Sequence, residues 1–135
     1  MPKEASCVCG ELRILVNGPP TVVSSCCCQA CQRRSGSLVA VQAFYDAGQV
    51  EAVSGISQKF VRIAESGKKV KYHFCPSCGT TLYWTPELRP GKVAIAVGAF
   101  ADRDFPSPER LVWTDFRHSW VQAPEGTREY PGNAP

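Results

Sequence analysis

The chain has 135 residues, a hydrophobic share of 44% and a formal net charge of +3. This length corresponds to one domain, and the hydrophobic share is that of a globular protein, which excludes a disordered chain. The mild charge argues against a nucleic-acid-binding module, because such modules concentrate Lys and Arg on one face or along one helix.

Short strands separated by Pro and Gly follow one another along the chain. We expect strands at residues 12–16, 22–25, 38–44, 50–53, 60–63, 70–74, 80–84 and 93–97. Residues 28–36 are polar and end in Ser-Gly-Ser, which predicts a turn or one short helical turn. Gly67 indicates a tight hairpin turn between two of the strands. Because no segment has the pattern of a long amphipathic helix, we expect a mainly β domain over residues 1–125 and a loose tail at 126–135.

Eight cysteines dominate the chemistry of the sequence. We find no secretory signal and no apolar run long enough to cross a bilayer, so we expect a cytoplasmic protein that binds neither membrane nor nucleic acid. The cytoplasm keeps thiols reduced. Clustered cysteines in such a chain are therefore interpreted as metal ligands or reactive groups, with disulfides as the alternative.

Two pairs of cysteines predict one closed metal site. Cys75 and Cys78 stand three positions apart and are followed by Gly79, whose backbone freedom lets the chain curl under both thiolates. Cys7 and Cys9 supply a second pair, since side chains two apart in an extended segment point to one side. Together they predict a tetrahedral structural zinc site. The alternative is a redox pair, which requires a helix after the second cysteine, but the residues after Gly79 favour a strand.

A second cluster predicts an open metal site. Cys26 and Cys28 point to the same side of an extended segment, while Cys27 points to the other. The turn after Cys28 can return Cys31 to the first two. Zinc with three protein ligands and a free fourth position is the catalytic arrangement, because the free position accepts water, hydroxide or a substrate thiolate.

Several alternatives stay open around this second cluster. His73 or His118 could complete it as a structural site, although each is interpreted first as a packed or solvated residue. Cys27 could be a small apolar filler or a free thiol that forms a mixed disulfide. Arg33 and Arg34 directly follow the cluster, where a guanidinium could offset its negative charge or hold a substrate carboxylate. The alternative for these arginines is a solvated loop charge.

Three ordered motifs, at 6–10, 26–36 and 74–80, resemble those of the glutathione-dependent formaldehyde-activating enzyme family, whose domain centromere protein V shares. The resemblance extends from about residue 5 to about residue 121. It implies an Mss4-like fold of small antiparallel sheets. It also implies a structural zinc and a catalytic zinc. The implied structural ligands are Cys7, Cys9, Cys75 and Cys78, and the implied catalytic ligands are Cys26, Cys28 and Cys31.

The activity implied by the resemblance is that of a carbon–sulfur lyase which joins glutathione to formaldehyde as S-hydroxymethylglutathione. A small thiol and a small aldehyde are the expected partners, with Arg33 and Arg34 as candidates for binding the glutathione co-substrate. We expect a monomer or a homodimer. Cys27 and Leu111 depart from the family pattern, where a polar residue and a histidine are common, and this bears on substrate identity. The alternatives are a non-catalytic zinc module that docks a partner protein and a thiol carrier.

Overall fold

The computed structural model describes residues 2–135 and is mainly β, as the sequence predicts. The expected strands are present, and residues 28–36 contain a short helix of seven residues. The helix is α1 (Gln29–Ser35), and the 3-10 helices are η1 (Ala47–Gln49), η2 (Val97–Phe100) and η3 (Thr114–Phe116). The strands are β1 (Lys3–Ser6), β2 (Arg13–Val16), β3 (Val22–Cys26), β4 (Ala40–Asp46), β5 (Val50–Ser54), β6 (Gln58–Ile63), β7 (Lys69–Phe74), β8 (Thr81–Pro86), β9 (Lys92–Ala96), β10 (Arg110–Val112) and β11 (Arg128–Glu129).

The strands form two sheets. The smaller sheet has the order β1-β2-β5 and is antiparallel. The larger one has eight strands in the order β11-β10-β3-β4-β9-β8-β7-β6, and its two parallel pairs are β10 with β3 and β10 with β11. The expectation of small antiparallel sheets therefore holds only in part. Parallel neighbours need long connections, and most of the chain lies between β3 and β10, so β10 can join the sheet beside β3.

The core lies between the smaller sheet and one face of the larger sheet. Each buried side chain of Leu or Ile size contributes about 1.5–3 kcal/mol to stability. The buried residues of this core are Ala5, Cys7, Leu12, Ile14, Val16, Val23, Ala43, Tyr45, Cys75, Leu82, Val93 and Ile95. Because side chains alternate along a strand, Val23 of β3 enters this core while Ser24 and Cys26 lie on the opposite face.

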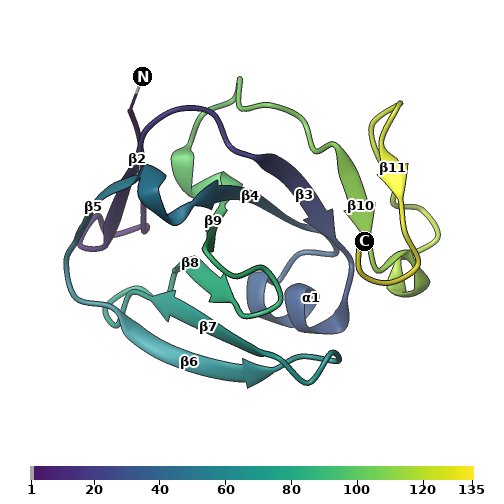
Figure 1. The fold of residues 1–135 in the computed structure, drawn as a ribbon, viewed down its shortest axis with the longest axis horizontal. Helices are drawn as coiled ribbons and strands as arrows, with labels where there is room; N and C mark the ends of the chain where they lie inside the picture. Colours follow the sequence, from purple (N-terminus) through teal and green to yellow (C-terminus); the bar gives the residue numbers. More distant parts are fainter. Residues whose placement is uncertain (1) are drawn as a thin grey trace.

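The larger sheet bends around α1, as Figure 1 shows. The Arg34 guanidinium of α1 lies over the Trp84 ring of β8 at 4.2 Å and over the Tyr72 ring of β7 at 5.7 Å. The helix begins at Cys28, whose side chain accepts from the Cys31 backbone N–H, and it ends at Gly36 with a φ of 70°. These contacts fix α1 against the face of the sheet that the core does not use.

The C-terminal segment packs against the body of the protein, although the sequence favours a loose tail there. Strand β11 pairs with β10, and the Tyr130 N–H donates to the Leu111 carbonyl at 2.9 Å. Ala134 is only 8% exposed. No helix within residues 2–135 has the length and apolar character that a membrane crossing requires.

Candidate metal centres

The first cysteine group lies where two hairpin tips meet. Cys7 and Cys9 occupy a turn between β1 and β2, in which the Cys7 N–H donates to the Leu12 carbonyl at 2.9 Å. The Gly10 N–H donates to the Cys7 carbonyl at 3.1 Å, and Gly10 has a φ of 84°. The two sulfur atoms therefore converge because the chain turns there, and not because the segment is extended as the sequence argument assumes.

The second tip, between β7 and β8, repeats this arrangement. The Cys75 N–H donates to the Thr80 carbonyl at 2.9 Å, and the Gly79 N–H donates to the Cys75 carbonyl at 2.8 Å. Gly79 has a φ of 77°, a conformation that L side chains rarely adopt. Glycine at this position thus lets the chain pass under the sulfur atoms, as expected for a knuckle around a metal.

The four sulfur atoms of this group have the spacing that a metal requires. All lie within 4.8 Å of one another. Cys9 Sγ is 3.6 Å from both Cys7 Sγ and Cys75 Sγ. Four thiolates around zinc at about 2.3 Å would stand about 3.8 Å apart. The Leu12 N–H also points at Cys7 Sγ from 3.2 Å and helps to hold a thiolate there. A tetrahedral zinc therefore fits this donor set.

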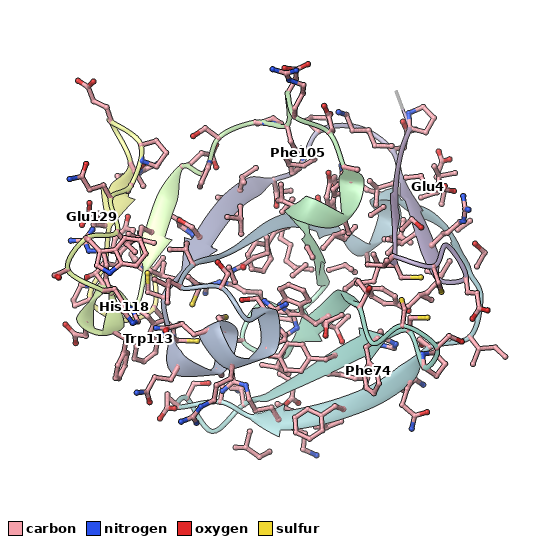
Figure 2. The ribbon with its side chains drawn as sticks, turned by 180° about the vertical axis from the view of Figure 1, so that it is seen from behind. Glu4, Phe74, Phe105, Trp113, His118 and Glu129 are labelled. Carbon is pink, nitrogen blue, oxygen red and sulfur yellow. The ribbon has the colours of Figure 1, made fainter. Side chains whose placement is uncertain are left out.

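The second group lies where β3 ends and α1 begins. Cys26 is the last residue of β3, Cys28 caps α1 and Cys31 lies in its first turn. Their sulfur atoms lie within 4.8 Å of one another. The Cys28 N–H points at Cys26 Sγ from 3.4 Å, and the Cys31 N–H points at Cys28 Sγ from 3.3 Å. Figure 2 shows the sulfur atoms in two separate groups, one toward Phe74 and one toward Trp113.

The electrostatics of the second group favour a cation. Hydrogen bonds from the Cys26 and Cys31 thiols lower the pKa of Cys28 to about 2, and the hydrogen bonds with Cys28 and Cys31 raise the pKa of Cys26. The group therefore holds one negative charge readily, and further thiolates repel it. A divalent cation removes this repulsion, so three thiolates and zinc suit one another.

Cys27 is not part of either group. Its side chain is fully buried, and burial raises the pKa of its thiol. The Cys27 N–H donates to the Val112 carbonyl at 3.1 Å. All eight cysteines are free, and the described groups of metal-ligating atoms contain no histidine. His73 stacks on the Tyr83 ring at 4.3 Å.

A cleft of about 180 Å³ opens beside the three-cysteine group. It lies on the face of the larger sheet opposite the core. Glu65 is the single acidic residue among its described lining residues. Its five cationic lining residues are Arg62, Lys68, Lys69, Arg89 and Arg110. The cleft therefore suits an anionic ligand that reaches the cysteines.

Arg62 is a site residue that the sequence reasoning did not identify. Its Nε donates to the Tyr72 hydroxyl at 3.3 Å. Burial opposes its charge, but the Tyr72 hydrogen bond and the nearby Cys28 and Cys31 sulfur atoms together raise the pKa of Arg62. Alternation along β6 provides a signal. It places this charged residue on the same face as Phe60, and that face also carries the inward side chains of β7.

Arg33 and Arg34 do not line this cleft. They line a neighbouring hollow of about 510 Å³ together with Phe60 and Phe74. Arg33 is exposed, whereas Arg34 is half-buried against the aromatic rings of the sheet. Their predicted contact with a substrate carboxylate stays a prediction.

Known proteins share the fold and the sequence motifs of this chain to different degrees. No curated protein matches this sequence. A solved structure of a Rhodobacter sphaeroides protein, a structural-genomics target, is similar with a TM-score of 0.57 and 18% identity over 94% of this chain and 98% of that one. At this identity the similarity concerns the fold alone. The model of one family matches residues 2–116, which confirms the resemblance seen in the cysteine motifs, and the chain therefore belongs to the glutathione-dependent formaldehyde-activating enzyme family.

Proposed function

We propose that this protein is a zinc-dependent carbon–sulfur lyase that adds a thiol, with glutathione as the first candidate, to formaldehyde or a related small aldehyde. One observation carries the proposal. Three cysteine sulfur atoms within 4.8 Å of one another adjoin a cleft lined by five cations. Membership of the family supports a thiol and formaldehyde as the reactants.

Two zinc ions with different roles belong to this proposal. The four-cysteine group would hold a structural zinc, and the two hairpin tips that carry it support an Mss4-like fold. Cys26, Cys28 and Cys31 would hold a second zinc that a chelator removes more easily, because only three protein ligands bind it. When bound there, zinc supplies a Lewis-acidic position that acidifies a thiol or polarises a carbonyl.

The residues of the chain have defined tasks in the reaction. A bond forms between the thiol sulfur and the aldehyde carbon, the carbonyl π bond breaks, and the thiol proton ends on the oxygen. No oxidant or reductant is needed. The Arg62 cation next to the cysteines favours negative charge on sulfur and oxygen. The cleft brings two reactants together, which supplies much of the rate increase for so facile an addition.

The cationic lining also supports the choice of thiol. Glutathione carries two carboxylates, and the five cations of the cleft favour such a ligand. We propose small molecules as the partners, in a cytoplasmic setting and without nucleic acid or membrane. The protein acts as a monomer or a homodimer in this proposal.

The test compares two neighbouring cysteines. Zinc-saturated protein is mixed with ¹³C-formaldehyde and glutathione, and magnetisation-transfer NMR measures how fast the adduct exchanges with its components. We expect exchange well above the uncatalysed rate, a loss of this increase in Cys28→Ser, and its retention in Cys27→Ala, since Cys27 lies outside the three-cysteine group.

Two other outcomes would replace the proposal. Exchange at the uncatalysed rate with two inert zinc ions would indicate a non-catalytic zinc module. A mass gain of one glutathione on the protein, lost in Cys28→Ser and reversed by a reductant, would indicate a thiol carrier. Equal exchange rates for the native protein and Cys28→Ser would rule out chemistry at the three-cysteine group.

A further inference from the structure

A row of polar side chains crosses the cleft face of the larger sheet beside the cysteines. Arg110 of β10 is the register partner of Ser24 of β3, which in turn is the partner of Gln42 of β4. The Arg110 Nε donates to the Ser24 hydroxyl at 3.1 Å. All three residues line the cleft. We call this set the polar row.

The polar row lies a short step from the three-cysteine group. Ser24 precedes Cys26 by two residues on the same strand, so both side chains face the cleft about 7 Å apart along β3. A ligand whose sulfur atom reaches Cys26, Cys28 and Cys31 can therefore place its next few atoms over the polar row. These atoms are the ones that distinguish one thiol from another.

Gln42 has an unused acceptor in this row. The residue is 6% exposed, and its Oε1 is buried without a hydrogen-bond partner among residues 2–135. A buried amide oxygen without a donor is unfavourable, and sheets rarely carry one without a reason. An N–H group on a ligand would satisfy this amide.

Two cations, Arg89 and Arg110, line the same cleft as this amide. Burial and the neighbouring Arg89 both lower the pKa of Arg110. Arg89 is held in place because its Nη2 donates to the Ala134 carbonyl at 2.8 Å. Two guanidinium groups that line one cleft repel each other, so a carboxylate bound between them is favourable.

We propose that the polar row is a subsite for an α-amino-acid head group on the thiol substrate. Arg110, with Arg89, binds the carboxylate, and the Gln42 amide oxygen accepts from the nitrogen beside it. The subsite selects thiols that carry both groups over thiols that carry one. This inference rests on the proposed function, since the three-cysteine group must bind the sulfur atom.

The test uses three matched thiols and no aldehyde. Homocysteine carries both groups, 4-mercaptobutyrate lacks the amine, and 3-mercaptopropylamine lacks the carboxylate. Calorimetry measures the Kd of each thiol for the zinc-saturated protein. We expect Arg110→Met to raise the Kd of homocysteine and of 4-mercaptobutyrate about tenfold and to leave the Kd of 3-mercaptopropylamine unchanged. Gln42→Met should raise the Kd of homocysteine and of 3-mercaptopropylamine and leave the Kd of 4-mercaptobutyrate unchanged.

This crossed pattern separates a subsite from a change in folding, because misfolding would weaken all three thiols together. If Arg110→Met does not fold, Arg110→Lys replaces it and should weaken the binding of only the two thiols that carry a carboxylate. Equal effects on all three thiols, or no effect on any, would overturn the subsite. If the crossed pattern is missing while the native protein still catalyses adduct exchange, the proposed function stands and the subsite is removed. The crossed pattern without any catalysed exchange would do the reverse.

Discussion

Gly55 connects the packing of the smaller sheet to the four-cysteine group. It follows β5 with a φ of 90°, and a Cβ built on it would lie 1.9 Å from the Glu11 carbonyl oxygen. That oxygen belongs to the backbone and cannot swing aside as a side chain would. The next residue, Leu12, donates its N–H to Cys7 Sγ at 3.2 Å. A displacement at Glu11 is therefore transmitted to a sulfur atom of the four-cysteine group.

Gly67 provides the matched control, because it separates the cost of backbone strain from the cost of the steric overlap at Gly55. It has a φ of 81°, and a Cβ added to it would have no heavy atom within 4 Å, so Gly67→Ala carries the backbone strain alone. A left-handed residue costs about 1–2 kcal/mol with a Cβ, and the stiffer unfolded chain returns about 0.4–1 kcal/mol. We therefore expect Gly67→Ala to cost about 1 kcal/mol. Gly55→Ala adds the overlap with Glu11, worth about 1–3 kcal/mol, for a total of about 2–4 kcal/mol.

Urea unfolding of the zinc-saturated proteins measures both free energies, and a chromophoric chelator measures zinc release. We expect Gly55→Ala to release the zinc of the four-cysteine group faster than the native protein, with the three-cysteine group unaffected. Gly67→Ala should release both ions at native rates. Free energies of unfolding for the two variants within about 0.5 kcal/mol of each other would contradict this expectation, since the overlap would then cost nothing.

Three further outcomes are expected. Cys75→Ser should lower the zinc content from two ions to one and the thermal midpoint by at least about 10 °C, because structural zinc supplies folding free energy; metal analysis and calorimetry check both. Leu82→Ala, at a position with no exposed surface, should cost about 2–5 kcal/mol in urea unfolding and leave the zinc content at two ions. Arg62→Met should lower kcat for adduct exchange about tenfold with little change in KM, and Arg62→Lys should recover part of the lost kcat. A rise in KM as large as the fall in kcat would contradict a charge effect.

The sequence predicts the division of the cysteines because the signal is local. In Cys26-Cys27-Cys28, strand alternation alone separates the middle sulfur from the other two, and the structure brings together Cys26, Cys28 and Cys31 without Cys27. The geometry of the Cys7 and Cys9 pair is less local, since it depends on a turn that the flanking strands close. The sequence predicts only a turn or one short helical turn where α1 lies, because seven residues show too little periodicity.

The cleft could not be predicted from the sequence. Arg62, Arg89 and Arg110 come from β6, from the turn before β9 and from β10, and only the strand order of the larger sheet brings them to one face. The strands β1, β10 and β11 are two to four residues long, so tertiary pairing decides their existence. The C-terminal segment packs for the same reason, through its pairing with β10 rather than through any propensity of its own.

The register of β3 couples the stability of the protein to its chemistry. Val23 lies in the core while Ser24 and Cys26 line the cleft, so a slip of β3 by one residue would turn Ser24 and Cys26 into the core and Val23 toward the cleft. The apolar core that holds Val23 on the other face of β3 opposes such a slip. The four-cysteine group braces that same core, since Cys7 and Cys75 belong to it. Loss of the zinc proposed for the four-cysteine group should therefore lower the free energy of unfolding, while the three-cysteine group keeps its own ion as long as the protein stays folded.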